Sequence, residues 1–295
     1  MTRITNSMVS RTVLADIQNV QAQLTATQER LSSGKQITKP SDDPFGTSRA
    51  LLFTNEISAN TQYQSNVQDA SSWLSTSDTA MSSMSGDAGR ARDLLLQGAN
   101  GSLDQNDKDA IADELDQLAD SIKTAGNTQY AGNYVFAGTK TQTPPFTVGG
   151  VDTYGGDTNA INRAIGDGVT MQVNATGDQV VSPILTAIRQ AATDLRAGGT
   201  PANLGTTDLN ALDAATAQLS SAQATVGARE NRLTSATSRL QQIQVAQSQQ
   251  LSDTADADVA QTMIDFSTQS AVYQAALKAG ANLIQPSLMN FLTTS

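Results

Sequence analysis

Two adjacent carboxylates, Asp42 and Asp43, are the first residues whose types and spacing could do chemistry. A carboxylate pair can bind Mg²⁺ or Ca²⁺ through oxygen, or act as general acid and base. The surrounding sequence Lys39-Pro-Ser-Asp-Asp-Pro44 favours a structural role instead. Asp is a preferred N-cap residue, and proline suits the first helical position because its missing N–H is not needed there. We therefore predict that Asp43 caps a helix whose first residue is Pro44, and that the pair binds no metal.

The residue types that most other catalytic sites need are missing. The 295-residue chain contains no His and no Cys, which excludes imidazole catalysis, thiol chemistry, disulfides and zinc sites with the usual ligands. Segment 104–108 does not match a calcium loop because Lys108 takes the third ligand position. Gly149-Gly150 and Gly155-Gly156 lack the Lys-Ser/Thr of a phosphate loop, so we predict hairpin turns there. We expect no enzyme activity, no catalytic residues, no cofactor and no metal.

The charge of the chain also restricts its partners. There are 18 Lys+Arg and 28 Asp+Glu, giving a formal net charge of −10. Nucleic-acid binding needs a basic face that displaces counterions, so we do not expect a nucleic-acid partner. The first twenty residues lack the apolar core of a cleaved secretory signal, and no stretch of 18 apolar residues is present to span a membrane.

Seven-residue repeats of apolar residues are the strongest pattern in the chain. They predict long helices that pack side by side at shallow angles. One such helix is predicted from 44 to 98, with two neighbouring rows of seam residues: Val67, Leu74, Met81, Ala88 and Leu95, and Tyr63, Ala70, Ser77, Met84 and Ala91. A second is predicted from 207 to 251, with the row Leu212, Leu219, Val226, Leu233 and Leu240. We expect these two helices to pair.

Shorter elements are predicted between the two long helices. Asp104 or Asn106 begins a helix that Gly126 ends, and Pro183 begins another that ends at Gly198-Gly199. Between them, residues 130–182 are rich in Gly, Pro, Asp and Thr with short β-favouring runs at 133–138 and 169–173. This composition predicts short strands joined by tight turns.

Each end of the chain carries a helix with one narrow apolar stripe. The first helix, ended by Gly34, has the stripe Leu14, Ile17, Leu24 and Leu31. The last helix, which we expect Pro286 to interrupt, has the stripe Val259, Met263, Phe266, Tyr273, Leu277, Ile284 and Leu288. Such stripes are too thin to bury a helix, so we predict that both bind each other and neighbouring copies. We expect both ends to be disordered and the last stripe exposed in the isolated chain.

The elements together predict a mainly α fold. It is a long coiled-coil-like helical bundle built from both chain ends, with a small central β-rich insert. The predicted parts are an N-terminal assembly helix at 1–43, bundle halves at 44–129 and 183–252, the insert at 130–182, and a C-terminal assembly helix at 253–295.

Several motifs resemble the bacterial flagellin family. They are Leu31-Ser-Ser-Gly-Lys35 followed by 40–44, Gly227-Ala-Arg-Glu-Asn-Arg-Leu233, and Tyr273-Gln-Ala-Ala-Leu277 with 287–292. Within the family, segments 39–44 and 132–141, with Pro145-Phe146, are similar to the proteins that join the hook to the filament. Residues 147–205 are not diagnostic.

This resemblance implies an extracellular structural subunit of the flagellum. Such a subunit is exported unfolded from the cytoplasm by the flagellar type III apparatus, and an export chaperone binds its C-terminal helix. Its copies form a ring between the first hook-associated protein and flagellin, with the terminal helices lining the inner tube, the long helices forming the next shell and the insert facing outward. The alternatives are a flagellin filament subunit, a carboxylate or metal enzyme, and a cytosolic coiled-coil scaffold.

Overall fold

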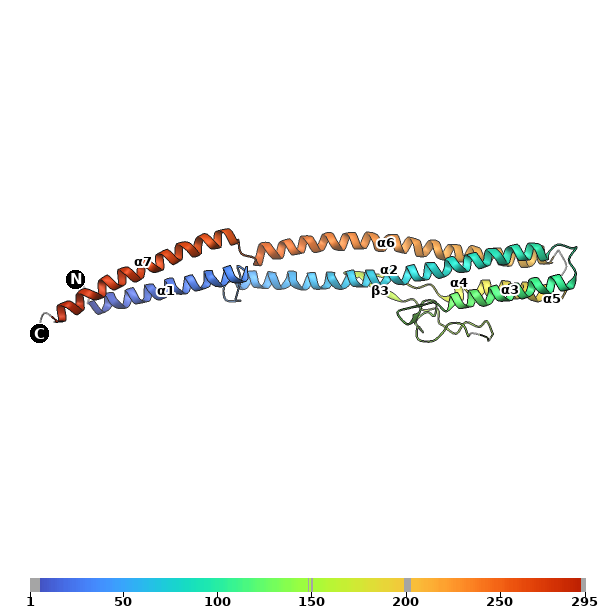
Figure 1. Cartoon of the computed structure of the whole chain (residues 1–295), viewed down its shortest axis with the longest axis horizontal. Helices are drawn as coiled ribbons and strands as arrows, with labels where there is room; N and C mark the ends of the chain where they lie inside the picture. Colours follow the sequence, from blue (N-terminus) through green and yellow to red (C-terminus); the bar gives the residue numbers. More distant parts are fainter. Residues whose placement is uncertain (1–5, 148, 150, 199–202, 293–295) are drawn as a thin grey trace. The chain divides into compact units, whose positions relative to one another are not determined.

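The computed structural model describes residues 6–147, 149, 151–198 and 203–292, with side chains for residue 8 and from residue 10 to residue 281 within these ranges (Figure 1). The long helices are α1 (Asn6–Ser33), α2 (Pro44–Gly98), α6 (Leu209–Ala255) and α7 (Val259–Leu292). The shorter helices are α3 (Gln105–Gly126), α4 (Gly177–Val180) and α5 (Ser182–Arg196), and the π-helical segment Asn203–Asp208 precedes α6. The predicted mainly helical fold with a small β-rich insert is confirmed.

Helix α2 begins where the sequence predicts. Oδ1 of Asp43 accepts hydrogen bonds from the backbone N–H groups of Phe45, at 3.1 Å, and Gly46, at 2.9 Å. A side chain at Gly46 would collide with this cap, because its Cβ would lie 2.3 Å from Oδ2 of Asp43 and 2.6 Å from Cδ1 of Ile37. The capping role predicted for Asp43 and Pro44 is therefore confirmed.

The chain forms two compact units, which are described separately. The first, here called the terminal unit, contains residues 1–59 and 244–295. The second, the central unit, contains residues 60–243. Helices α2 and α6 contribute residues to both units.

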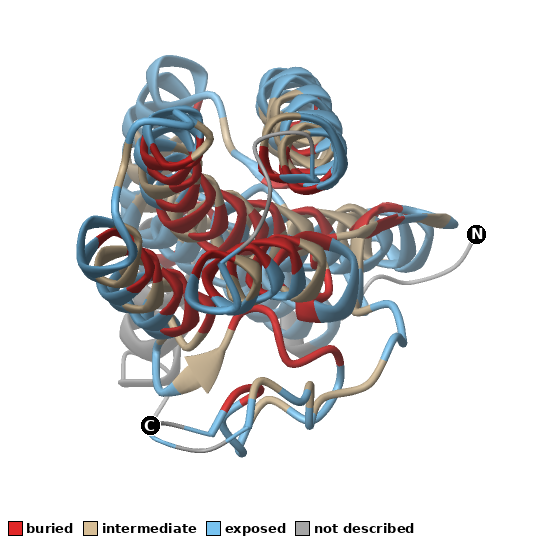
Figure 2. Cartoon of the chain, turned by 90° about the vertical axis from the view of Figure 1, so that its right-hand side faces the viewer, coloured by how far each residue is buried: buried red, intermediate tan, exposed pale blue. Residues whose placement is uncertain are grey.

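In the central unit, α2 and α6 run antiparallel and side by side (Figure 1). Nδ2 of Asn60 donates a hydrogen bond to the carbonyl of Leu240 at 2.9 Å, and Arg92 forms an ion pair with Asp213 at 2.7 Å. Figure 2 colours the inward sides of the helices as buried. The predicted seam is confirmed, because these residues are each no more than 3% exposed: Val67, Leu74, Met81, Ala88, Leu95, Leu212, Leu219, Val226, Leu233 and Leu240. Because the repeat is unbroken, the apolar contact continues along this whole segment.

Helices α3 and α5 pack against each other and complete the core of the central unit. Asp104 caps α3 by accepting a hydrogen bond from the backbone N–H of Asp107 at 2.9 Å. Their inward faces are buried, as the repeats predict, through Ile111, Leu115 and Ile122 of α3 and Ile184, Leu185, Ile188 and Leu195 of α5. Leu195 also lies against Gly98, whose missing side chain leaves room for it.

The insert contains two antiparallel hairpins, β1 (Gln129–Tyr130) with β2 (Asn133–Tyr134), and β3 (Asn162–Gly166) with β4 (Val169–Gln172). Their turns lie at Ala131-Gly132, with φ values of 48° and 80°, and at Asp167-Gly168, where Gly168 has φ 63°. Positive φ at these positions is what a tight hairpin requires. The strand predicted at 169–173 is confirmed, with its end at Gln172.

Two predictions about the insert are wrong in part. The β-favouring run 133–138 is a strand only at Asn133–Tyr134. The residues that follow are buried, and the carbonyl of Phe136 accepts a hydrogen bond from the backbone N–H of Gly177 instead of joining a strand ladder. Gly155-Gly156 is not a hairpin turn. Gly156 permits a close approach, since a Cβ there would lie 2.7 Å from the carbonyl oxygen of Ala137. Gly149 has φ 72°, and Gly150 lies outside the described residues.

Helix α7 also differs from the prediction. It continues through Pro286 to Leu292, so the expected interruption is wrong. Proline removes one backbone hydrogen bond, and the rest of the helical ladder on either side is sufficient to keep the helix continuous.

The seam generates the first testable prediction. Leu233→Asp should lower the free energy of unfolding by several kcal/mol, because Leu233 is 1% exposed and an unpaired charge would be buried there. Gln242→Asp, on the exposed side of the same helix, is the matched control and should change it by less than about 0.5 kcal/mol. Urea unfolding followed by circular dichroism measures both, and equal midpoints would show that the seam is assigned to the wrong face.

Asp208 gives the central unit a pH-dependent contribution to stability. It is 3% exposed in the π-helical segment, and burial, with the neighbouring carboxyl of Asp194, raises the pKa of Asp208 to about 6. Its usual pKa is 3.8, so at a pH well below 3.8 it is protonated whether the chain is folded or unfolded. As pH rises through about 6, the folded chain must ionise a buried acid, and this stability is lost.

We therefore predict that Asp208→Asn stabilises the chain near neutral pH only. At pH 7.5 the variant should be about 1–2 kcal/mol more stable than the natural chain, because the amide carries no charge. At pH 4 the two should have nearly the same stability. Thermal unfolding at both pH values tests this, and a difference that does not change with pH would contradict it.

Candidate assembly surfaces

The terminal helices α1 and α7 pack on each other in an antiparallel pair (Figure 1). Two contacts set their register. Oγ1 of Thr27 and Oε1 of Gln269 are 2.7 Å apart in a hydrogen bond, and the backbone of Gly280 lies against Val13 and Ile17. A Cβ on Gly280 would approach Ile17 to 3.2 Å, so a small residue lets the helices come close there.

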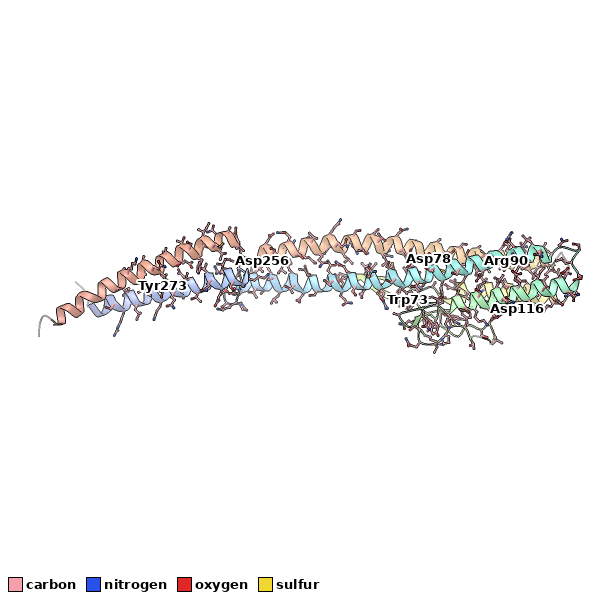
Figure 3. All side chains as sticks on the ribbon, viewed as in Figure 1. Trp73, Asp78, Arg90, Asp116, Asp256 and Tyr273 are labelled. Carbon is pink, nitrogen blue, oxygen red and sulfur yellow. The ribbon has the colours of Figure 1, made fainter. Side chains whose placement is uncertain are left out.

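The contact between α1 and α7 is narrow and partly polar. At every third or fourth position each helix has a buried or half-buried residue: Val13, Ile17, Val20, Leu24, Thr27 and Leu31 of α1, and Thr262, Phe266, Gln269, Tyr273, Ala276 and Gly280 of α7. Among these, only Thr27, Thr262 and Gly280 are fully buried. Figure 3 labels Tyr273 within this pair. The pair therefore buries much less apolar surface per residue than the central unit.

The predicted stripes fall on different sides of this pair. Ile17, Leu24 and Leu31 are partly buried in it, while Leu14 is 56% exposed. Phe266 and Tyr273, which we expected to be exposed in the isolated chain, are also partly buried in it. Ile284 and Leu288 lie on α7, but their side chains are outside the described residues.

Other apolar residues of α7 remain exposed. We call them the outer stripe: Val259, Met263 and Leu277 share one side of the helix, Ile264 and Val272 lie on its other exposed sides, and all five are between 44% and 60% exposed. Single exposed apolar residues are ordinary, but several along one helix mark a surface that binds a partner. Three of them, Val259, Met263 and Leu277, belong to the predicted stripe.

Some residues of the α1–α7 contact were missed by the sequence analysis. Val13, Val20 and Thr27 form a second row on α1. The signal was present, because these positions alternate in steps of four and three with the predicted ones. Only Thr27 lacks an apolar side chain that marks the row. Ala276 and Gly280 of α7 were expected as small residues that let another helix approach closely, and Gly280 does so.

The loops that follow α1 and α6 are joined to each other. Lys35 forms an ion pair with Asp256 at 2.5 Å, and its neighbours form backbone hydrogen bonds between 34–36 and 255–257. Asp42 orders the first loop by accepting hydrogen bonds from Thr38 and from the backbone N–H of Lys39. The Thr38 hydroxyl is the main reason that the pKa of Asp42 is lowered. Asp42 and Asp43 thus have separate structural roles.

The first turns of α2 expose a second apolar patch. Phe45 is 72% exposed, and Leu51 and Leu52 are each more than half exposed. The guanidinium of Arg49 lies 5.9 Å from the ring centres of both Phe45 and Phe53. An arginine placed over aromatic faces leaves a surface that can accept either apolar or acidic groups.

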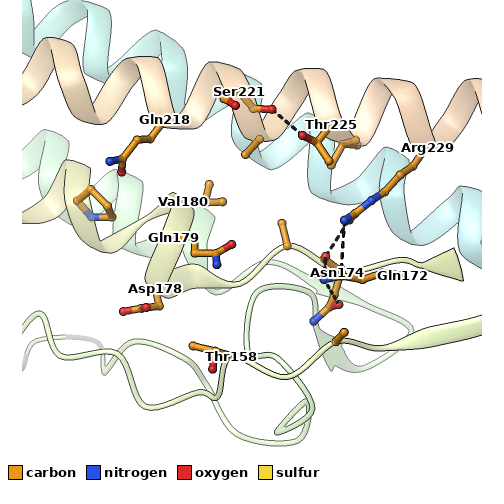
Figure 4. Close-up of a pocket in the computed structure, with 15 residues that line it drawn as sticks. Thr158, Gln172, Asn174, Asp178, Gln179, Val180, Gln218, Ser221, Thr225 and Arg229 are labelled. Atoms are coloured by element: carbon orange, nitrogen blue, oxygen red, sulfur yellow. Dashed lines mark hydrogen bonds between the residues drawn. The ribbon is translucent and has the colours of Figure 1, made fainter.

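A groove of about 650 Å³ lies in the central unit between α6, α4 and the insert (Figure 4). Its most buried charge is Arg229, which donates hydrogen bonds to the carbonyl of Asn174 at 3.0 Å and to Oε1 of Gln172 at 3.3 Å. Burial lowers the pKa of Arg229. The rest of the lining is mainly amides, hydroxyls and small apolar groups, so Arg229 fastens the insert to α6 and no nucleophile–base pair is formed.

A network of ion pairs connects α3, α5 and the insert. Arg189 contacts Asp116 at 2.6 Å and Asp152 at 2.7 Å, and Lys123 also forms an ion pair with Asp152. Arg196 contacts Asp116, which is labelled in Figure 3, at 2.6 Å. Burial alone would raise the pKa of Asp116, but hydrogen bonds from Arg189 and Arg196 lower it. The network holds the insert against the helices.

The part of the chain that the structure describes contains neither a cluster of acidic metal ligands nor a helix suited to cross a membrane. Among residues 6–147, 149, 151–198 and 203–292, no group of three or more acidic residues is placed to hold a metal ion. Within the same ranges, no helix has the length and apolar character needed to cross a membrane.

Comparisons with known proteins agree with this architecture. The family model of the bacterial flagellin N-terminal helical region matches residues 4–141, and that of the C-terminal helical region matches residues 209–292. Flagellar hook-associated protein 3 of Escherichia coli K12 is 25% identical over 94% of this chain and 95% of its own length. The same-named protein of Salmonella typhimurium is 28% identical over 62% of this chain and 57% of its own length.

A solved structure described as a flagellar hook-associated protein from Vibrio parahaemolyticus has a similar fold. It is 28% identical, with a TM-score of 0.66 over 73% of this chain and all of that one. Flagellins also match, but over a smaller share of their own length than the two hook-associated proteins. The two family models together span most of the chain, from α1 to beyond β2 and from α6 to the end of α7. The chain therefore belongs to the bacterial flagellin family.

Proposed function

We propose that this chain is a structural subunit of the bacterial flagellum that joins the hook to the flagellin filament. The proposal is supported by the end-to-end similarity to hook-associated protein 3 of Escherichia coli, which covers 95% of that protein. It is also supported by the motifs at 39–44 and 132–141. Copies of the chain form a ring in this account, between the first hook-associated protein and flagellin.

The observation that carries the proposal is the outer stripe of α7. Helices α1 and α7 already pack their inner residues against each other. Helix α7 still exposes these apolar residues to solvent: Val259, Met263, Ile264, Val272 and Leu277. Fully burying one such side chain is worth about 1.5–3 kcal/mol, so contact with neighbouring copies would add substantial stability. An exposed stripe of this kind is costly in a free protein and useful in an assembled one.

The predicted parts of the chain take the following roles in this proposal. Segments 1–43 and 253–295 line the inner tube, 44–129 and 183–252 form the next shell, and the insert at 130–182 faces outward. The chain is exported unfolded from the cytoplasm, and an export chaperone binds the C-terminal helix. The assembled protein then lies outside the cell as part of the flagellum.

A flagellin filament subunit is the second candidate, because flagellins share the same terminal helices. Abundance separates the two. A filament subunit is the main component of sheared filaments, whereas a junction protein is a trace component. Catalysis has no part in either role.

Deleting the gene for this chain tests the proposed role directly. Cells that lack the chain should build a hook without a filament and release flagellin into the medium, because nothing connects the two. Electron microscopy and quantification of flagellin in the supernatant measure this. Normal filaments on the deletion strain would rule out the junction role.

A second prediction concerns the outer stripe. Met263→Ser with Leu277→Ser should prevent filament attachment while leaving the melting temperature of the purified protein within about 2 °C, since both side chains are exposed before assembly. The matched control is Gln261→Ser with Gln274→Ser, two exposed polar residues of the same helix.

The two readouts must be taken together. Filament counts on cells complemented with each variant report assembly, and thermal unfolding reports the fold of the monomer. If the apolar double variant melts much earlier and still supports filaments, the outer stripe belongs to the folded monomer and not to an assembly surface.

A further inference from the structure

The arginines of the central unit divide into two groups. Five form ion pairs with carboxylates: Arg90, Arg92, Arg163, Arg189 and Arg196. The other three, Arg229, Arg232 and Arg239, form no ion pair with any described residue. All three lie on α6, at steps of three and seven, and therefore share one side of the helix. Acidic residues outnumber basic ones in residues 60–243, so three unneutralised arginines in one place are unexpected.

Arg232 and Arg239 are exposed, and they frame a small recess. The recess has a volume of about 190 Å³ and lies between α6 and the β3–β4 hairpin. Ile165, Val169 and Ala236 form its apolar part, and Ser235 lies at its edge. Gly166 leaves space for Arg239, because a Cβ there would lie 3.1 Å from Nη2 of Arg239. Both arginines therefore line a recess that the hairpin and α6 form together.

Helix α3 presents the complementary pattern. Asp113, Gln117 and Asp120 lie along one exposed row, at steps of four and three. The side chains of Asp113 and Asp120 are 70% and 66% exposed, the highest values among the ion-paired carboxylates. Each uses only Oδ1 in its contact with Arg196 or Arg189, so Oδ2 remains available to accept a second partner.

The spacing of the two charged pairs is the same. Arg232 and Arg239 are seven residues apart on α6, as are Asp113 and Asp120 on α3, which is about 10.5 Å on each helix. Helices that pack at a shallow angle bring residues with a seven-residue spacing into register. The two carboxylates of α3 can therefore lie beside the two arginines of α6, with Gln117 above the recess.

We propose that α3 of one copy docks on the α6–hairpin surface of a second copy, with Asp113 and Asp120 paired to Arg232 and Arg239. This inference rests on the proposed assembly of copies and names the two faces that meet. The two faces are different parts of the chain, so the contact is heterologous, and such contacts build rings or helical arrays and not closed two-fold dimers. The contact is electrostatic and must weaken as salt rises.

A cross-link between copies tests this placement. The chain has no cysteine, so Gln117→Cys with Ser235→Cys introduces the only two thiols. When intact flagella carrying this variant are treated with a short bismaleimide, we expect a ladder of covalent oligomers. Ser82→Cys with Ser235→Cys is the matched control, since Ser82 is exposed on α2 and lies outside the proposed contact. A ladder from the control alone, or from neither variant, would overturn the proposal.

Charge exchange tests the chemistry of the contact. Arg232→Glu with Arg239→Glu, in the cross-linking background, should reduce the ladder about tenfold, because like charges then oppose each other. Adding Asp113→Lys and Asp120→Lys restores opposite charges and should restore the ladder. Lys140→Glu, an exposed reversal elsewhere in the central unit, should leave it unchanged. No rescue by the fourfold variant would contradict the pairing.

Two further readouts keep the outcomes separate. Asp113→Asn with Asp120→Asn is a milder change if the lysine variants fold poorly, and it should also weaken the ladder. If filaments attach normally to cells in which the ladder is absent, the proposed docking fails while the junction role stands. If cells without the chain still carry filaments, the junction role itself fails.

Discussion

The continuous contact between α2 and α6 in the central unit is the interaction on which the rest of that unit depends. Apolar residues at every seventh position keep the seam unbroken, and each of its main residues is almost fully buried. Helices α3 and α5 and the insert then cover the remaining apolar sides. Ion pairs from Arg189 and Arg196 join these covering elements to one another, but they lie at the edges and contribute less than the buried seam.

The terminal unit, in contrast, has no continuous buried apolar seam among its described residues. Helices α1 and α7 share a contact in which Thr27, Thr262 and Gln269 take places that leucine would fill in a stable coiled coil. These polar contacts fix the register of the two helices but contribute little to the free energy of their association. The pair leaves apolar side chains exposed on α7 and on the first turns of α2, which is consistent with the assembly role proposed above.

Much of this fold was predictable from the sequence because its signals are local. The caps at Asp43 and Asp104, the stop at Gly34 and the seam of α2 and α6 follow from residue type and spacing, and all are confirmed. The inner row of α1 was only half recognised, since Thr27 carries no apolar signal. The ion-pair network and the raised pKa of Asp208 depend on residues distant in sequence, which spacing alone does not identify.

Solvent access to the outer stripe of α7 before and after assembly tests the central claim most directly. Because the chain has no cysteine, Met263→Cys and Leu277→Cys can each be labelled with a maleimide in the purified monomer and in intact flagella. Lys140→Cys in the insert, which is proposed to face outward, serves as the reference. The account predicts rapid labelling of all three in the monomer, and protection of Met263→Cys and Leu277→Cys alone in flagella. Equal labelling of the outer stripe in both states would contradict it.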